Sequence, residues 1–411
     1  MTREALPRYR HVRPRAVVPC ATAEDVAAAL ERARRERLRV AVRSGGHCFA
    51  GRSSTDGLLV DVSPMRSVTV GDGTATVGAG AVLGDLYDAL DAHGLTIAGG
   101  CGPTVGIAGL ALGGGLGILG RRHGLTCDQL VAAEVVLADG RVVECDAERE
   151  SDLFWALRGA GGGQLGVVCR LELRTLPAPR VTTLDLVWPP AHAAAAIAAW
   201  QDWAPDAPDE VAASLVIADE VHLFGAMAPG QDLDAFVAGV GADPTSAALR
   251  ELPYREAKRH LAEHGPAEGP EGHLYSRSEF FRQPLPAGAT AALADHFATP
   301  GPFRVLDLSP WGGAYNRVAP DATAFAHRRE RFLVKHDVVA ATPADAAEAR
   351  EWLARSWEIV HPWGSGGVYP NFPDPDLDDW ARAYHGPNLE RLRRVKARYD
   401  PERVFAFEQS L

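Results

Sequence analysis

The chain has 411 residues, of which 46% are hydrophobic, and its 42 basic and 53 acidic side chains give a formal net charge of −11. This length supports two closely packed domains, and the negative balance argues against a nucleic-acid-binding surface. The N-terminal residues lack the apolar centre of a secretory signal, and no apolar run reaches the length of a membrane span. We therefore expect a cytoplasmic protein without a membrane partner; the sequence leaves its oligomeric state open.

The first part of the chain predicts short strands mixed with helices. Residues 22–37 have an acidic first turn, Ala/Leu periodicity and a basic end, which are typical of a helix. Mixed elements of this kind favour an α+β fold over a regular doubly wound sheet. Strands are expected over 38–42, 58–62, 67–70 and 74–78, with a hairpin turn at 71–73, and a second helix over 82–93 that ends at Gly94.

A glycine-wrapped histidine follows the first of these strands, in the run Arg43-Ser44-Gly45-Gly46-His47 with Gly51 close behind. Glycines let successive backbone N–H groups converge on a pyrophosphate, and Arg43 adds positive charge. His47 would then face the group that carries the phosphate. A histidine that caps an ordinary turn is the alternative.

A glycine-rich stretch spans residues 99–120 and contains Gly115-Leu116-Gly117-Ile118-Leu119-Gly120, the spacing of a dinucleotide fingerprint. Taken alone, this spacing suggests an NAD enzyme with a Rossmann domain. However, no clear strand precedes it and the glycines extend far upstream, so the context argues against that interpretation. A Rossmann enzyme would also be colourless when purified.

The rest of the chain predicts further α+β structure on both sides of a boundary at residues 176–179. Six cysteines, at positions 20, 48, 101, 127, 145 and 169, form no Cys-x-x-Cys pair, so we expect no metal site. Strands are expected over 131–137, 141–144, 167–173, 214–218 and 221–226, with a turn at Asp139-Gly140, and helices over 191–203 and 343–360.

The run from Arg43 to His47 with Gly51 resembles the signature of the berberine-bridge-enzyme-like flavin oxidases, within the PCMH-type (vanillyl-alcohol-oxidase) FAD-binding superfamily. The tail, including Tyr369-Pro370-Asn371, resembles the family's closing segments. The resemblance implies a two-domain α+β, PCMH-type FAD-binding fold. Its expected parts are an FAD-binding domain over 1–178, an α+β substrate domain over 179–367, and a C-terminal berberine-bridge-like segment over 368–411 that returns to the FAD domain.

The resemblance also implies FAD attached covalently to His47 through the 8α-methyl of its ring. A neutral imidazole nitrogen is a suitable nucleophile for that carbon. The other residues that the resemblance places at the cofactor are Arg43, Ser44, Gly45, Gly46, Gly51, Cys101, Val105, Gly106, Gly109, Gly113, Gly114, Gly117, Gly163, Val168 and Asn371.

Cys101 lies where many relatives carry a second link, from sulfur to flavin C6. The usual pattern is Cys-x-x-Val-Gly, whereas here the thiol is one residue further from Val105-Gly106, and an ungapped match places Gly102 at the linking position. Two alternatives therefore stay open: a thiol that still reaches the ring, or an unlinked cysteine that lines the loop.

The resemblance implies an oxidase that transfers hydride from a small organic alcohol, sugar or natural product to FAD, with reoxidation by dioxygen and release of peroxide. Tyr369 is the leading candidate for the base that takes the hydroxyl proton, with its pKa lowered by a cation or a tyrosine partner, and Tyr315 is a second. A glutamate that some relatives carry before Phe-x-His-Arg is absent, since Ala322-Thr323-Ala324 precede Phe325. A dehydrogenase with another acceptor and a non-catalytic flavin- or ligand-binding protein are the alternatives.

Overall fold

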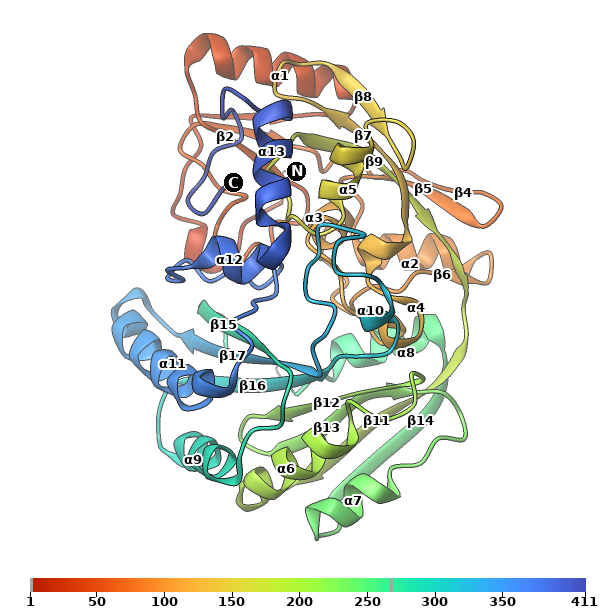
Figure 1. Cartoon of the computed structure of the whole chain (residues 1–411), viewed down its shortest axis with the longest axis vertical. Coiled ribbons are helices and arrows are strands. Elements are labelled where there is room, and N and C mark those ends of the chain that lie inside the picture. The colour runs from red at the N-terminus through yellow and green to blue at the C-terminus, as the bar shows by residue number, and fades with distance from the viewer. Residues whose placement is uncertain (1–2, 267–268) are drawn as a thin grey trace.

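The computed structural model describes residues 3–266 and 269–411, which form two lobes (Figure 1). One buried core gathers residues between Cys20 and Leu173 together with Ala324 and the C-terminal segment from Leu392, while the other draws on Leu184 to Val360. These separate cores support our proposal of an FAD domain over 1–178 that the segment 368–411 completes, and a substrate domain over 179–367.

The first lobe contains a parallel and an antiparallel sheet. The hairpins expected at 71–73 and at Asp139-Gly140 are confirmed, since β4 pairs with β5 and β7 with β8. The parallel sheet has the order β1 (Ala16–Pro19), β3 (Leu58–Asp61), β2 (Val40–Arg43); the antiparallel sheet has the order β4 (Val68–Val70), β5 (Thr74–Gly78), β9 (Val167–Arg174), β7 (Leu130–Val136), β8 (Val142–Cys145); and β6 (Leu95–Thr96) pairs with β10 (Leu176–Pro177).

The first two predicted helices are confirmed, as α1 (Ala23–Glu36) and α2 (Leu83–Asp91). Thr22 and Asp25 form a capping box at the start of α1, and Arg37 ends it in the left-handed conformation with φ 54°. The glycine-rich stretch contains the short helix α3 (Ile107–Leu112) and ends where α4 (Gly120–His123) begins, so a helix and not a strand precedes Gly115. The Rossmann interpretation is therefore wrong.

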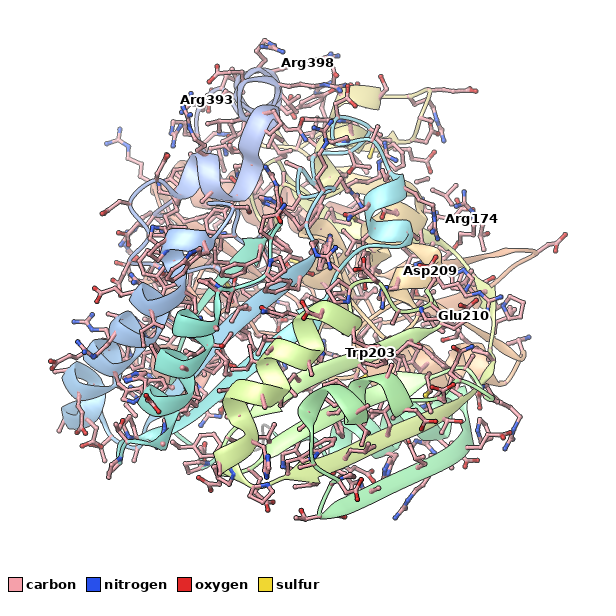
Figure 2. The ribbon with its side chains drawn as sticks, turned by 60° about the horizontal axis from the view of Figure 1, so that its bottom comes forward. Arg174, Trp203, Asp209, Glu210, Arg393 and Arg398 are labelled. Carbon is pink, nitrogen blue, oxygen red and sulfur yellow. The ribbon has the colours of Figure 1, made fainter. Side chains whose placement is uncertain are left out.

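A seven-stranded antiparallel sheet forms the second lobe, and helices α6, α9 and α11 cover its outer face (Figures 1 and 2). Only β12, β13, α6 and α11 were predicted in this part of the chain. The strand order is β14 (Ser246–Pro253), β11 (Arg180–Trp188), β13 (Val221–Met227), β12 (Val211–Ile217), β16 (Phe303–Pro310), β17 (Phe332–Ala340), β15 (His273–Phe281), and the helices are α6 (Ala193–Trp203), α7 (Asp234–Val240), α8 (Tyr254–Glu263), α9 (Ala287–Ala298), α10 (Ala314–Arg317) and α11 (Ala346–Val360).

The C-terminal segment returns to the first lobe through α12 (Trp380–His385) and α13 (Leu389–Tyr399), and α13 lies beside α5 (Ser151–Leu157) (Figure 1). Lys396 of α13 is buried, where it pairs with Asp400 at 2.7 Å and donates to the carbonyl of Gln164. Earlier in the same segment, Tyr369 accepts from the Gly115 N–H and Asn371 donates to the Leu110 carbonyl, so these residues lie against the glycine-rich stretch. Among the described residues, no helix combines the length and apolar character needed to cross a membrane.

Candidate active site

The turn that follows β2 places His47 against a second glycine turn. Gly46 has φ +80°, in the left-handed region that favours glycine, and a Cβ on Gly45 would lie 2.2 Å from the backbone nitrogen of Gly106. Ser44 fixes the same turn by donating its hydroxyl hydrogen to the Ala79 carbonyl at 2.6 Å. The two turns therefore meet backbone to backbone, which only glycine permits.

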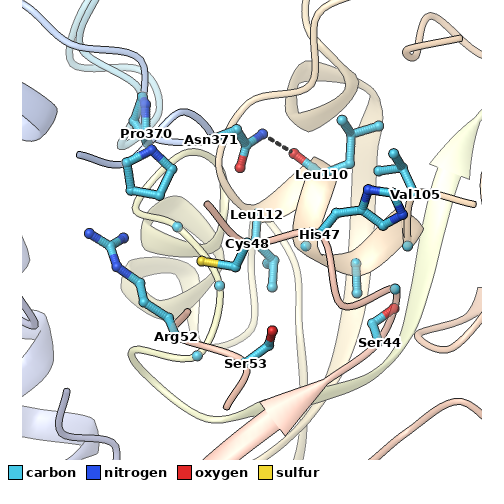
Figure 3. A pocket seen from close by; sticks show the side chains of 18 of the residues that line it. Ser44, His47, Cys48, Arg52, Ser53, Val105, Leu110, Leu112, Pro370 and Asn371 are labelled. Atoms are coloured by element: carbon cyan, nitrogen blue, oxygen red, sulfur yellow. Dashed lines mark hydrogen bonds between the residues drawn. The ribbon is translucent and has the colours of Figure 1, made fainter. Parts of the chain in front are cut away.

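A cavity of about 350 Å³ opens beside these two turns (Figure 3). Its lining in the described part of the chain includes Arg52 and no acidic side chain, which suits a ligand that carries phosphate. From the set predicted by sequence, the cavity is lined by Ser44, Gly45, Gly46, His47, Val105, Gly106, Gly109, Gly163, Val168, Tyr369 and Asn371.

The glycines of this lining leave room for a cofactor. A Cβ on Gly109 would meet no atom within 4 Å, and Cβ atoms on Gly162 and Gly163 would meet their nearest neighbours only at 3.8 and 4.0 Å. Side chains at these positions would extend into open space beside the backbone. The cavity thus combines exposed backbone, a cation and open space beside its glycines, which suit a phosphate-bearing cofactor such as FAD.

The surroundings of His47 favour the neutral form of its imidazole. Burial, together with the positive charge of Arg3, lowers its pKa below the usual value. Its Nε2 lies 3.0 Å from the Thr104 hydroxyl. A neutral ring keeps a lone pair on one nitrogen, so His47 can act as a nucleophile toward a bound cofactor.

Tyr369 lines the same cavity from the C-terminal segment. Its hydroxyl oxygen accepts hydrogen bonds from the Gly115 backbone N–H at 2.7 Å and from Asn371 Nδ2 at 3.2 Å, and Asn371 Nδ2 also donates to the Leu110 carbonyl (Figure 3). Burial raises the pKa of Tyr369, and the two hydrogen bonds act in the opposite direction. The expectation that a neighbouring cation or tyrosine lowers this pKa is therefore wrong, because desolvation is the larger effect.

A second cavity, of about 190 Å³, adjoins the first, and Gly100 and Leu116 line both. It lies between the glycine-rich stretch and strands β12, β13 and β16 of the second lobe. Three residues of the predicted set lie here instead of in the first cavity: Cys101, Gly117 and Tyr315. Tyr315 donates its hydroxyl hydrogen to the Gly117 carbonyl at 3.2 Å.

Asp307 is a carboxylate of this second cavity that the sequence analysis missed. Burial raises its pKa, while the charge of Lys335 and a hydrogen bond from Ser309 Oγ, at 3.0 Å, counteract that rise. The residue lies on β16, in a strand without a recognisable motif, and its partners come from β12 and β17. Only the pairing of these strands brings the group together.

Four other predicted cofactor residues lie outside the linings of both cavities: Arg43, Gly51, Gly113 and Gly114. Arg43 directs its guanidinium to the carbonyls of Ser53 and Arg3, both at 3.0 Å, and so braces the loop behind His47. A Cβ on Gly51 would meet the ring of Tyr9, one on Gly113 would meet Asn371, and one on Gly114 would meet the rings of Tyr369 and Phe325. These glycines make space for neighbouring side chains.

Cys101 is paired with a buried lysine from the second lobe. Lys258 of α8 is 1% exposed, donates to the backbone carbonyls of Gly99 and Gly100, and brings its Nζ within 3.7 Å of Cys101 Sγ. Burial lowers the pKa of Lys258. The sulfur of Cys101 therefore lies in the second cavity, beside Lys258.

Comparisons with known proteins identify the relatives of this chain. Residues 14–146 match the FAD binding domain family, and residues 368–411 match the family described as berberine and berberine like. The chain is 33% identical to the FAD-linked oxidoreductase YgaK of Bacillus subtilis, over 99% of this chain and 92% of the relative. It is 32% identical to chitooligosaccharide oxidase of Gibberella zeae, over 97% and 87%.

Solved structures of berberine-bridge-enzyme-like proteins and of a related oxidase also superpose on this chain. BBE-like 1 of Physcomitrella patens superposes with a TM-score of 0.91 at 28% identity, over 99% of this chain and 93% of that chain. Glucooligosaccharide oxidase of Acremonium strictum has a TM-score of 0.89 at 26% identity, over 99% and 94%, and its structure is described as that of a 6-S-cysteinyl, 8α-N1-histidyl FAD enzyme.

Proposed function

The chain belongs to the berberine-bridge-enzyme-like family of FAD-linked oxidoreductases, and on this premise we propose that it is an oxidase whose FAD is attached to His47. The observation that carries the proposal is that His47 and Tyr369 line one cavity, which a second cavity adjoins. The first cavity fits the cofactor and the second fits a substrate. When bound, FAD accepts a hydride from a substrate carbon and passes the electrons to dioxygen, which is released as peroxide.

Tyr369 is our proposed acceptor of the substrate hydroxyl proton. The Gly115 N–H and Asn371 Nδ2 both donate to its oxygen, and this pair of donors stabilises a phenolate. Asp307 is the second candidate, because it is a carboxylate in the adjoining cavity whose pKa burial raises. Arg52 is positioned to offset negative charge on the cofactor.

The substrate class that we propose is a small hydroxylated compound, such as a sugar, a phenolic compound or another natural product. Polar side chains of Ser214, Asp307 and Ser309 line the second cavity and can hydrogen-bond to hydroxyl groups. The relatives named chitooligosaccharide oxidase and glucooligosaccharide oxidase support the carbohydrate part of this class.

We further propose that the flavin is attached only at His47. The sulfur of Cys101 lies beside Lys258 in the second cavity, and Gly100 takes its place in the lining of the first.

We also propose a cytoplasmic location. Its support is that all six cysteines are free in the part of the chain that the structure describes.

Flavin reduction without air tests the oxidase proposal. We expect a yellow protein whose absorbance is bleached by at least one member of a panel of sugars, phenols and other alcohols, and restored by air with release of hydrogen peroxide. Slow recovery in air together with rapid recovery by an artificial electron acceptor would favour a dehydrogenase. A flavin that no panel member bleaches would favour a non-catalytic binding protein.

A further inference from the structure

The side chain of Thr104 reaches the imidazole that we assign to cofactor attachment. Its Oγ1 lies 3.0 Å from His47 Nε2. We propose that Thr104 accepts the Nε2 hydrogen of His47, so that the lone pair stays on Nδ1 and this nitrogen forms the bond to FAD. The inference rests on the proposed function and concerns the attachment step, which precedes turnover.

The backbone on both sides of Thr104 is fixed by the first turn of α2. The Leu83 N–H donates to the Val105 carbonyl at 3.0 Å, and the Gly84 N–H donates to the Pro103 carbonyl at 2.9 Å. Thr104 thus lies between two residues that the same helix holds. Its hydroxyl is preorganised although the side chain itself is exposed.

Close backbone contacts also fix the loop that carries His47. A Cβ on Gly46 would lie 2.1 Å from the Glu4 carbonyl oxygen, and Gly45 packs against the backbone of Gly106. The two loops therefore cannot slide past each other without losing these contacts. The hydrogen bond between Thr104 and His47 is therefore held by the backbone contacts of both loops.

The direction of that hydrogen bond decides which nitrogen can react. A neutral imidazole has one N–H group and one lone pair, and burial beside Arg3 favours the neutral ring. With Nε2–H donated to Thr104, the lone pair must lie on Nδ1. Because Thr104 is exposed, its own hydroxyl hydrogen can bond to water.

Attachment of FAD to His47 conserves atoms and electrons. A bond forms between Nδ1 and the 8α carbon, one C–H bond of that carbon breaks, and its hydrogen leaves as a proton. The Nε2 hydrogen also leaves as a proton, through Thr104 to water. The electron pair from the broken bond reduces the flavin, and dioxygen takes up the two electrons and two protons as hydrogen peroxide.

Substitutions at Thr104 test the inference through the rate of covalent attachment, independently of turnover. Apoprotein is mixed with FAD in air, samples are denatured in acid, and protein-bound flavin fluorescence is followed in denaturing gels. Thr104→Val keeps the size of the side chain but removes its hydroxyl. We expect it to slow attachment by about 3- to 10-fold, which is the effect of losing one hydrogen bond. Thr104→Ser is expected to restore a rate within about twofold of the unmodified chain.

Two further variants complete the design. Thr69→Val makes the same change at an exposed threonine of β4 and should attach flavin at the unmodified rate. His47→Ala sets the zero level. An unchanged rate in Thr104→Val would overturn the inference, as would attachment of the unmodified chain through Nε2. If the unmodified chain attaches no flavin, the His47 assignment in the proposed function fails as well, so the two failures are distinguishable.

Discussion

Replacing Tyr369 with phenylalanine is expected to lower the rate of flavin reduction by about 10²- to 10⁴-fold, the usual contribution of a positioned proton acceptor. The ring and its packing against Phe325 and Phe372 stay, while the oxygen that accepts from Gly115 and Asn371 is lost. Stopped-flow reduction of the variant under anaerobic conditions, with the best substrate of the panel, measures the effect. Tyr399→Phe removes a tyrosine hydroxyl at the end of α13 that is bonded to Glu150, and it serves as the control.

The pH profile separates Tyr369 from Asp307 as the proton acceptor. Burial raises the pKa of Tyr369, so the phenolate fraction, and with it the rate of reduction, should grow as pH rises through the alkaline range. Tyr369→Phe should abolish this alkaline rise. If Asp307 were the acceptor, activity would instead be lost only as pH falls through the acidic range. Asp307→Asn would then lower the rate more than Tyr369→Phe does.

Removing the carboxylate of Asp128 is expected to lower the free energy of unfolding by about 3–5 kcal/mol, because it leaves a buried guanidinium without its partner. Arg328 is 1% exposed and donates to both oxygens of Asp128, at 2.6 and 2.9 Å. The pair joins the 3-10 turn Thr126–Gln129 to the segment that carries Phe325, whose ring packs on Tyr369. Urea unfolding of Asp128→Ala, followed by fluorescence, measures the loss.

Asp56→Ala is the matched control for this prediction. Asp56 pairs with Arg39 at 2.6 Å, but both side chains are more than half exposed, at 63% and 75%. Such pairs contribute about 0–1 kcal/mol, so this variant should unfold almost as the unmodified chain does. Equal effects of the two substitutions would contradict the assigned role of the buried pair.

Local patterns were sufficient where the structure depends on neighbours in sequence. The helix predicted over 22–37, the two hairpin turns and the placement of His47 on a glycine turn after β2 all follow from short-range chemistry. Most of the predicted cavity residues belong to such turns, where glycine supplies a backbone conformation or a close approach that other residues cannot adopt.

Sequence patterns were insufficient where contacts between distant segments decide the surroundings of a residue. Arg43 turns away from the cavity because the carbonyls of Arg3 and Ser53 fold back onto it. Cys101 lies beside Lys258, which belongs to α8 of the other lobe. No local sequence pattern predicts this contact. Asp307 gains its environment from strands paired across the seven-stranded sheet. The alignment of β12, β16 and β17 brings together residues that are far apart in the sequence.

Peptide mass spectrometry of acid-denatured protein tests the central claim most directly. The account predicts that flavin stays bound to the protein and that its added mass maps to the peptide that contains His47, with Cys101 unmodified. Flavin on Cys101 as well would contradict the single attachment inferred from its position beside Lys258. FAD released entirely into the supernatant would contradict the assignment of His47 as the attachment site.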